Sequence, residues 1–533
     1  MPRSTSVLSP NLSLRRTVRK PSLRSKGGIV VTQNRIASEV GARVLKAGGH
    51  AVDAAVAAAM AVGVVEPWMS GVGGVGVMLV RDGKTGKVTG FDFGGVSPKA
   101  LDPRDYPVVG GADTNLFGWA AVKDNRNTVG ATSIAVPSQP AGLETAHKMF
   151  GRKRWRDLLA PAIEQAEAGL VVDWYTMLNI TSAMGDLARF PATAKRFLPG
   201  GLPPQPPVAT LASGIVRLPM PDLARTLKAI AADGAGVMYK GALAKAIAGD
   251  VKAMGGSLSE DDLGAYKVRV IEEPLEISYG ERTIHVLPEL NGGTSLWVAW
   301  DELKRMRKRA EAKPNGKTFT AYAAALRKAW EHRFEKLGDA GERTAPTSTT
   351  HLCVVDRDGN MVTLTQTLLS LFGSRVVLPK SGILMNNGIN WFDPVPGGPN
   401  SIGPGKRALA NYAPAIMTGG GEAVAIGGCG GRKIIPAVFQ LLTMMADFGL
   451  DLDEAFHAPR IDVSGLGPVA ADRRLGDKTI AALAEHFDTV VCEPVPYPFP
   501  FTIAGAVRRA RGMNEGATEP EQPWSEAVGE EEV

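Results

Sequence analysis

A threonine that follows a polar segment has the clearest potential for chemistry in this sequence. Residues 341–348, Gly-Glu-Arg-Thr-Ala-Pro-Thr-Ser, have the composition of an exposed loop, and Thr349 and Thr350 come directly after them. If the bond between Ser348 and Thr349 is cut, Thr349 gains a free α-amino group, whose unperturbed pKa is near ~8. That amine can accept the proton of the hydroxyl on the same residue, so Thr349 can act as nucleophile and base. In the alternative interpretation, both threonines are ordinary strand residues.

A glycine-rich run at residues 427–431, Gly-Gly-Cys-Gly-Gly, is a second candidate for catalysis. It lies between a predicted strand at residues 424–426 and a predicted helix at residues 434–448. A glycine-rich turn from strand to helix exposes backbone N–H groups with no side chain in the way. Such groups can stabilise the oxyanion of an acyl-transfer intermediate. In the alternative interpretation, the glycines only allow the turn.

A third glycine motif, Gly-Val-Gly-Gly-Val-Gly at residues 71–76, matches the dinucleotide-binding pattern Gly-x-Gly-x-x-Gly. That pattern binds a pyrophosphate only where a strand precedes it and a helix follows it. Here a predicted helix at residues 51–65 precedes the glycines, and predicted strands follow them. We therefore reject nucleotide binding. We expect the glycines to let the backbone pass close to a neighbouring segment or to substrate.

The order and spacing of motifs in both halves of the chain resemble the γ-glutamyltranspeptidase family. The second half contains Thr349-Thr-His, Val354-x-Asp-x-x-Gly-Asn, Thr365-Gln-Thr, Phe372-Gly, Ser381-Gly-Ile-Leu-x-Asn-Asn and Pro404-Gly-Lys-Arg. The first half contains Gly28-Ile-Val, Ala47-Gly-Gly, Ala51-Val-Asp-Ala-Ala-Val and the glycines of residues 71–76. The resemblance extends over residues 27–465 and includes the threonine and both glycine motifs.

The resemblance implies a fold and a domain organisation. Members of the family are N-terminal-nucleophile hydrolases, which have an α+β fold of four layers, αββα, built from both halves of a self-cleaved precursor. For this chain it implies a large subunit at residues 27–348 and a small subunit at residues 349–533 that starts at the nucleophile. Residues 1–26 are expected to form a basic, disordered leader, and the end of the chain, from about residue 512, an acidic tail.

The resemblance also implies the roles of single residues. Thr349 would attack its own preceding carbonyl group and later the carbonyl group of a small-molecule amide, giving an acyl-enzyme that water or another amine resolves. Thr367 matches the threonine that supports the nucleophile, and Gly430 and Gly431 match the glycines that bind the oxyanion. No metal or organic cofactor is implied. Whether the processed subunits dimerise is left open.

The residues that recognise a glutamyl group in the family are mostly absent from this chain. Gly94-Gly95 stands where the family has an arginine for the substrate carboxylate, and Leu369 replaces an asparagine. Trp391 replaces the acidic residue, Gly388 replaces a polar residue, and Ala410-Asn411 replaces a pair of serines. An α-ammonium group without an acidic partner is poorly held, and a bidentate arginine contact is a major orienting interaction for a carboxylate.

These departures predict a pocket that is more apolar than the family's usual one. Arg375 and Asn411 are candidate replacements for orienting an acid or an amide. In these departures the chain resembles the cephalosporin acylases and oxamate amidohydrolases that share the fold. The function hypotheses are therefore a γ-glutamyl hydrolase or transferase, an acylase or amidohydrolase on a glutaryl- or oxamate-type substrate, and an unprocessed non-catalytic relative.

The elements that must position Thr349 can be predicted from local sequence patterns. Residues 349–356 and 361–368 favour β-strands, and Asp358-Gly359 between them suits the positive φ angles of a tight hairpin turn. We therefore expect a hairpin whose first strand begins at the threonine. His351, in that strand, is interpreted as a packed residue rather than a base.

Helices are predicted on both sides of the glycines at residues 71–76. Residues 35–47 have the spacing of an amphipathic helix, and the alanine-rich residues 51–65 predict a buried helix that packs closely on a sheet. Residues 268–286 are predicted to form paired strands, and residues 295–309 a helix. No segment has the spacing of a metal site.

The net charge of +6 does not indicate binding to nucleic acid, because its excess lies at the start of the chain. No acidic residue occurs before Glu39, and residues 515–532 are acidic, so both ends are interpreted as solvated tails. The longest apolar run is too short to span a bilayer. Three scattered cysteines and the lack of a signal-peptide core predict a cytoplasmic protein, with a transit peptide as the alternative.

Overall fold

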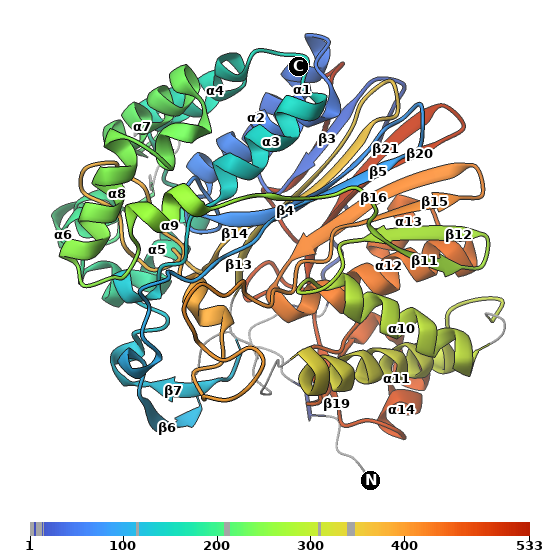
Figure 1. The fold of residues 1–533 in the computed structure, drawn as a ribbon. Coiled ribbons are helices and arrows are strands. Elements are labelled where there is room, and N and C mark those ends of the chain that lie inside the picture. The colour runs from blue at the N-terminus through green and yellow to red at the C-terminus, as the bar shows by residue number, and fades with distance from the viewer. Residues whose placement is uncertain are drawn as a thin grey trace.

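The structure is a computed structural model of the continuous chain. It describes residues 5–6, 13, 15–112, 117–206, 214–307, 311–337 and 347–533. The predicted loop at residues 341–346 lies outside this range. In the described residues, helices and three smaller sheets surround two large antiparallel sheets (Figure 1).

Each of the two large sheets has seven strands. The first sheet, in spatial order, consists of β10 (Arg269–Ile271), β5 (Val88–Phe93), β4 (Val75–Arg81), β14 (Met361–Ser370), β13 (Thr347–Val355), β3 (Ile29–Thr32) and β22 (Glu526–Gly529). The second sheet consists of β11 (Leu275–Tyr279), β12 (Arg282–Val286), β15 (Ala415–Gly419), β16 (Glu422–Cys429), β20 (Ile503–Ala510), β21 (Met513–Thr518) and β2 (Leu23–Ser25).

Smaller sheets lie outside these two. One contains β1 (Thr5–Ser6), β19 (Thr489–Cys492), β18 (Val469–Asp472) and β17 (Ile461–Asp462). Two-stranded sheets pair β6 (Val108–Ala112) with β7 (Ala120–Val122), and β8 (Leu170–Val171) with β9 (Arg217–Leu218).

Helices form two groups, which lie on opposite sides of the pair of large sheets in Figure 1. The group on the side of the first sheet consists of α1 (Arg35–Lys46), α2 (Ala51–Val65), α3 (Gln139–Phe150), α4 (Trp155–Ala168), α5 (Trp174–Leu187), α6 (Pro191–Phe197), α7 (Pro221–Asp233), α8 (Ala242–Ala253) and α9 (Glu260–Ala265). The other group consists of α10 (Gly293–Met306), α11 (Gly316–His332), α12 (Ile434–Phe448), α13 (Leu452–His457) and α14 (Asp477–Ala484).

Short helical turns connect many of these elements. The 3-10 turns are Pro103–Asp105, Lys123–Asn125, Ala131–Ser133, Pro199–Gly201, Ala235–Met238, Gly388–Trp391, Gly431–Lys433 and Arg473–Leu475, and a π-helical turn spans Arg333–Leu337.

Apolar side chains gather in three cores. One core lies between the two large sheets, and the other two lie on the outer faces of these sheets. Along β13, Leu352 and Val354 point to the core under α1 and α2, whereas Cys353 and Val355 point to the core between the two sheets. This alternation follows from the two-residue period of a strand. A third core packs α10, α11 and α12 on the far face of the second sheet.

The predictions for the first two helices are confirmed. α2 is buried along almost its whole length, because its alanines bring the helix close to the sheet. A capping box starts it: the side chain of His50 accepts a hydrogen bond from the helix backbone, and Asp53 accepts one from the backbone of His50 over 2.8 Å. Paired strands are present within 268–286, as predicted. The helix predicted at 434–448 is α12, and the helix predicted at 295–309 is α10, which begins and ends a few residues earlier.

The predicted hairpin is confirmed, with a different start. Asp356 accepts hydrogen bonds from the backbone N–H groups of Asp358 and Asn360, and Gly359 has φ +83°. The first strand, however, begins at Thr347, two residues before Thr349. Thr349 therefore lies inside a strand, and the prediction of a strand that begins at this threonine was wrong.

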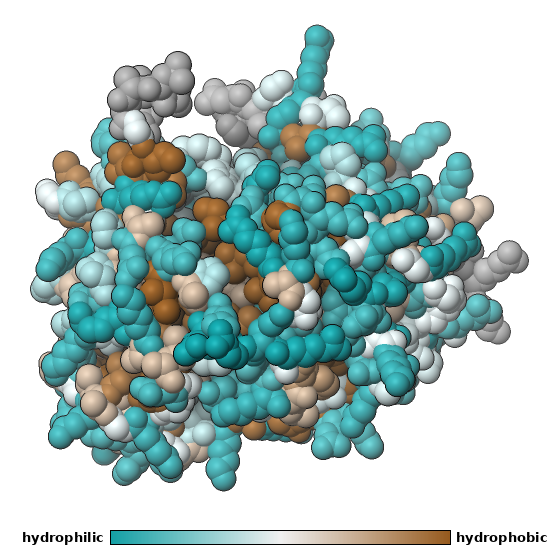
Figure 2. All heavy atoms as spheres, turned by 90° about the horizontal axis from the view of Figure 1, so that it is seen from above, coloured by the Kyte–Doolittle hydropathy of each residue, from teal (hydrophilic) through white to brown (hydrophobic). Residues whose placement is uncertain are grey.

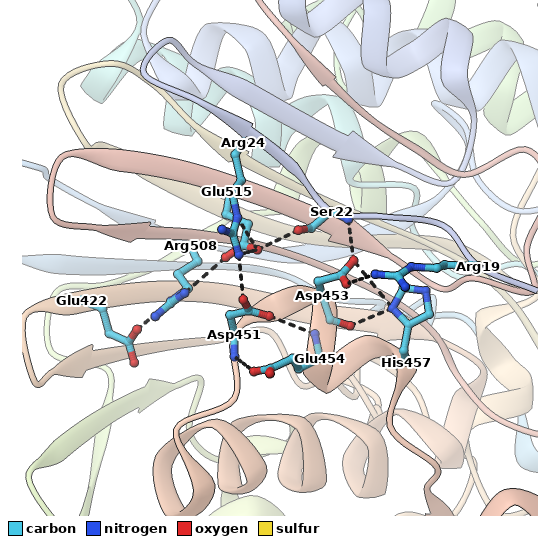
Figure 3. A network of polar contacts seen from close by, with 10 residues as sticks. All are labelled: Arg19, Ser22, Arg24, Glu422, Asp451, Asp453, Glu454, His457, Arg508 and Glu515. Atoms are coloured by element: carbon cyan, nitrogen blue, oxygen red, sulfur yellow. Dashed lines mark hydrogen bonds and ion pairs between the residues drawn. The ribbon is translucent and has the colours of Figure 1, made fainter.

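The described part of the basic leader is not a solvated tail. β2 pairs antiparallel with β21, and Arg19 and Arg24 form ion pairs with Asp453 and Asp451 over 3.2 and 2.6 Å (Figure 3). The acidic end is not a tail either, because β21 and β22 complete the two large sheets. Both ends are therefore held by strand pairing, and ion pairs to Asp451 and Asp453 add to the contacts of the leader.

No helix in the described parts of the chain combines the length and apolar character needed to cross a membrane. In Figure 2, one face of the molecule is covered mostly by hydrophilic side chains, with hydrophobic ones in separate small patches.

Candidate active site

Thr349 lies at an irregularity in β13. The register between β13 and β14 shifts between Ser348 and Thr350, which is the signature of a β-bulge. Thr349 is 4% exposed, and its hydroxyl donates a hydrogen bond to the hydroxyl of Thr367 over 3.3 Å. The structure thus brings together the two threonines that the sequence singled out. A β-bulge changes the direction in which a side chain points relative to a regular strand.

Thr367 is held in place from two directions. Its hydroxyl accepts the backbone N–H of Leu369 over 2.7 Å, and Leu369 has a φ of +88°, which is uncommon for a side chain of this size. Behind it, a Cβ added to Gly74 would lie 2.5 Å from the carbonyl oxygen of Thr367. The prediction that the glycines of residues 71–76 allow close backbone approach is confirmed.

The glycine-rich turn lies beside the nucleophile. β16 ends at Cys429, and Gly431 opens a 3-10 turn that leads into α12. Gly430 and Gly431 have φ values of +135° and +59°, which favour glycine. As the first residue of the turn, Gly431 has no acceptor for its N–H within the turn. This geometry suits an oxyanion-binding donor.

A small cavity of about 10 Å³ joins these groups. Its lining residues are Phe117, Thr349, Leu369, Trp391, Asn411, Tyr412, Gly431 and Ile434. Immediately upstream of Thr349, Ser348 pairs with Leu369 of β14, and Leu369 lines the cavity. Thr349, Gly431 and Asn411, three of the residues singled out in the sequence, therefore line one cavity.

Two polar groups of the cavity wall have no hydrogen-bond partner among the described residues. They are the carbonyl oxygen Oδ1 of Asn411 and the hydroxyl of Tyr412, and both residues are at least nine-tenths buried. Sequence reasoning missed Tyr412, although its position next to Asn411 was a usable signal. It also missed Phe117, which lies far from every motif and gave no signal.

Arg375 lies elsewhere. Its guanidinium donates to the carbonyl oxygen of Gly373 and lies 3.7 Å from Asp186 of α5. It is not among the residues that line the cavity at Thr349. Its φ of +65° turns the chain so that the side chain points toward the helical layer, which the sequence did not reveal.

His351 is a packed strand residue, as expected. Its ring nitrogens lie 3.0 Å from the hydroxyl of Thr365 and 3.1 Å from the sulfur of Cys353. Burial lowers the pKa of His351 to about 3, so the imidazole is neutral at pH 7.

Cys429 precedes the oxyanion glycines and is also buried. Burial is the main cause that raises the pKa of its thiol to about 12, and it is therefore uncharged at neutral pH. No cluster of three or more metal-ligating side chains occurs in the described ranges.

Comparisons with known proteins identify the family of this chain. The family model described as gamma-glutamyltranspeptidase matches residues 37–348 and 340–528. The chain belongs to this family. It is 32% identical to the acylase ACY 1 proenzyme of Pseudomonas sp. (strain SE83), over 94% of this chain and 92% of that protein. It is 31% identical to the glutathione hydrolase proenzyme of Bacillus subtilis (strain 168), over 82% and 80% of the two chains.

A solved structure extends the likeness to the fold. The cephalosporin acylase from Bacillus halodurans superimposes with a TM-score of 0.81 at 25% identity, and covers 98% of this chain and 99% of that one. The mixed helix and sheet of this γ-glutamyltranspeptidase-family chain thus match a solved acylase over nearly their full length.

Three of the positions that differ from the expected glutamyl-binding pattern, Gly95, Gly388 and Trp391, pack against one another. A Cβ added to Gly95 would lie 3.3 Å from the indole of Trp391, and one added to Gly388 would lie 3.2 Å from it. Both distances are shorter than ordinary contact, so the two glycines make room for the indole. Tyr412 packs edge-on against Trp391, with ring centroids 5.9 Å apart.

An arginine from another segment occupies the neighbourhood of Gly94. Arg407 donates to Asp92 over 3.1 Å and to the carbonyl oxygen of Gly94 over 3.2 Å. Arg407 is thus engaged by protein groups on the loop where the family has its carboxylate-binding arginine. It does not line the cavity.

Proposed function

We propose that this protein is a self-processing amidohydrolase whose nucleophile is Thr349. The observation that carries the proposal is the position of the Thr349 hydroxyl, bonded to Thr367 at a bulge and sharing a cavity with Gly431. The proenzyme names of two relatives support a precursor that is processed into two subunits.

In the first step the hydroxyl oxygen of Thr349 attacks the carbonyl carbon of Ser348. A C–O ester bond forms, the C–N bond breaks, and the nitrogen takes the hydroxyl proton. Water then hydrolyses the ester, which leaves a carboxylate on Ser348 and a free α-amine on Thr349.

In each later turnover the α-amine accepts the proton of the Thr349 hydroxyl as its oxygen attacks the substrate amide. The new C–O bond gives an acyl-enzyme after the C–N bond breaks, and the leaving amine takes the proton. Gly430 and Gly431 donate N–H groups to the oxyanion, and water or a second amine resolves the ester. Thr367 orients the nucleophile.

The two products would be subunits of residues 27–348 with the leader, and residues 349–533. In the first sheet, β14 and β13 of the small subunit would lie between β4 and β3 of the large one. In the second sheet, β12 pairs with β15 and β2 pairs with β21 across the same division. Each large sheet would thus contain strands of both subunits. Together with the three apolar cores, this arrangement supports the four-layer αββα sandwich of N-terminal-nucleophile hydrolases.

The test is the mass and N-terminal sequence of the purified protein. We expect two fragments that separate at Ser348 and Thr349. Thr349→Ala should leave one chain, whereas Thr350→Ala, at a neighbouring buried threonine, should still be cut. A parent protein that stays intact and inactive contradicts the proposal.

Hydrolysis or transfer of a γ-glutamyl amide is the second candidate, because the family model matches both halves of the chain. Turnover of a γ-glutamyl anilide, with and without an added amine acceptor, measures it directly.

A further inference from the structure

The wall of the cavity beside Thr349 carries no charged side chain among the described residues. Of its eight lining residues, four are apolar, and they are Phe117, Leu369, Trp391 and Ile434. A carboxylate or ammonium group placed there would leave water without gaining a partner of opposite charge.

Arginines on neighbouring segments are already engaged. Arg432 lies over the rings of Phe117, Trp330 and Phe334, and donates to the carbonyl oxygen of Phe117 over 3.3 Å. Arg333 donates to the carbonyl oxygen of Ala410 over 3.0 Å. Arg407 is bound to Asp92 and Gly94, as described above. These contacts engage each guanidinium with groups of the protein itself.

The apolar wall is built into the backbone around it. Trp391 packs on Gly95 and Gly388 at distances that a side chain at either position would disturb. Restoring an arginine at residue 95 would therefore displace the indole. Gly95, Gly388 and Trp391 therefore form one tightly packed apolar surface.

Two residues that line the cavity each have a neutral polar atom with no hydrogen-bond partner among the described residues. The Oδ1 atom of Asn411 is an acceptor, and the hydroxyl of Tyr412 can donate or accept. Burial, together with the charge of Asp92, raises the pKa of Tyr412 well above its ordinary value, so the hydroxyl stays neutral. Buried polar groups are ordinarily hydrogen-bonded, so these two groups are available to bond an acyl group that enters the cavity.

We infer that the acyl group accepted beside Thr349 is uncharged, with an apolar body against Trp391 and Leu369 and a neutral hydrogen-bonding end at Asn411 and Tyr412. This inference rests on the proposed function, because it assigns the acyl side of the same site. It separates the chain from γ-glutamyl substrates, which are zwitterionic, and from glutaryl substrates, which are anionic.

The cavity must open before such a group can enter. In the continuous chain Thr347 and Ser348 pair with Ser370 and Leu369, and so cover the edge of β14 next to the cavity. Cleavage before Thr349 releases that edge. The experiment therefore uses the processed protein.

Four p-nitroanilides with the same five-carbon acyl chain test the inference. They carry a pentanoyl group, its neutral terminal amide (4-carbamoylbutanoyl), its terminal acid (glutaryl), and a γ-glutamyl group. The amide and the acid are nearly isosteric and differ in charge. We expect kcat/KM to be at least about tenfold higher for the two uncharged compounds than for the two charged ones.

Two variants test the assigned contacts. Tyr412→Phe should lower kcat/KM for the 4-carbamoylbutanoyl compound more than for the pentanoyl compound, and so reduce their ratio. Trp391→Asp should shift preference toward γ-glutamyl. Tyr322→Phe, at a buried tyrosine of α11 outside the cavity, is the matched control and should leave the ratio unchanged.

The outcomes are distinct. Preference of the processed parent for glutaryl or γ-glutamyl anilide overturns the inference and leaves the proposed function standing. Processed protein that turns over none of the four also overturns the substrate assignment. A chain that remains uncut overturns the proposed function itself.

Discussion

The hydrogen bond between the hydroxyls of Thr349 and Thr367 joins two neighbouring strands at the proposed reaction centre. Because Thr367 accepts from both Thr349 and the backbone of Leu369, it fixes the direction in which the nucleophile's proton points. Its contribution is one of geometry, since a hydroxyl that rotates freely would spend little time aimed at the carbonyl carbon.

Replacing this acceptor tests that role. We expect Thr367→Val, which has the same shape without the hydroxyl, to slow self-cleavage by about tenfold or more, the effect of one lost hydrogen bond. Thr367→Ser should retain most of the rate. The measurement is a gel time course of small-subunit appearance after expression in a cell-free system.

Thr350→Val is the control, because the Thr350 hydroxyl is buried and has no hydrogen-bond partner in the described part of the chain. Equal cleavage rates for Thr367→Val and the parent would show that Thr367 does not orient the nucleophile.

Sequence reasoning located most of the reaction centre at this scale and part of the pocket. Thr349, Thr367 and Gly431 were singled out because the motifs that contain them resemble those of the family, and their roles remain a proposal. The contact of Arg375 with Asp186 of α5 could not be predicted, because the two residues lie far apart in the sequence. Tyr412 was missed although it is next to Asn411, and only the structure shows that its hydroxyl has no partner among the described residues.

At the scale of elements, the face-to-face contact of the two sheets depends on a glycine. His351 of β13 packs against Gly427 of β16, where an added Cβ would lie 2.3 Å from the imidazole. The ring is also bonded to Thr365, so it has little freedom to move away.

Gly427→Ala should therefore lower the stability of the protein by about 1–3 kcal/mol, the usual cost of overpacking. Gly185→Ala in α5 is the matched control, since a Cβ there meets open space and alanine favours the helix. Thermal unfolding of both variants in a Thr349→Ala background, which keeps a single chain, gives the comparison. A Gly427→Ala midpoint equal to that of the background would refute a tight sheet contact.

The end of α2 carries a carboxyl group whose titration should be visible in stability. Glu66 caps this helix, is 1% exposed, and burial raises its pKa from 4.5 to about 8. Between these two pH values the folded chain keeps a proton that the unfolded chain has lost. The free energy of unfolding should therefore fall as pH rises from about 4.5 to about 8 and then level off, with a slope of at most about 1.4 kcal/mol per pH unit.

Glu66→Gln removes this titration and retains a neutral side chain that can bond Asn34, which donates to Glu66 over 3.2 Å. We expect the variant to be more stable than the parent at pH 8.5 and similar to it at pH 5. Urea midpoints in the Thr349→Ala background measure the difference. Parallel pH profiles for the two proteins would contradict the raised pKa.

Local patterns predicted the helices and the hairpin well, because their signals lie within a few residues. The start of β13 was not predicted, since Thr347 and Ser348 become strand only by pairing with residues on β14. The docking of β2 on β21 was missed for the same reason. Its partners lie at opposite ends of the chain, and the sequence showed only their opposite charges.

At the scale of the whole molecule, the two ends of the chain tie the proposed subunits together. Glu515 of β21 is 4% exposed and accepts hydrogen bonds from Ser22 over 2.7 Å and from Arg24 over 3.3 Å (Figure 3). It also pairs with Arg508 over 3.2 Å. Ser22 and Arg24 belong to the leader and Glu515 to the small subunit, so this carboxylate links the two products of cleavage.

Glu515→Gln should weaken that link. A neutral amide cannot pair with two guanidinium groups, and we expect a loss of about 1–3 kcal/mol, the effect of removing a buried charged acceptor. Glu272→Gln is the control, because its ion pair with Lys87 is exposed and should contribute little. The measurement is the urea concentration at which the subunits of the processed protein separate on size-exclusion chromatography. Equal midpoints for Glu515→Gln and the parent would show that the sheets shared by the two subunits hold them together, and that the contacts of Glu515 with the leader do not contribute.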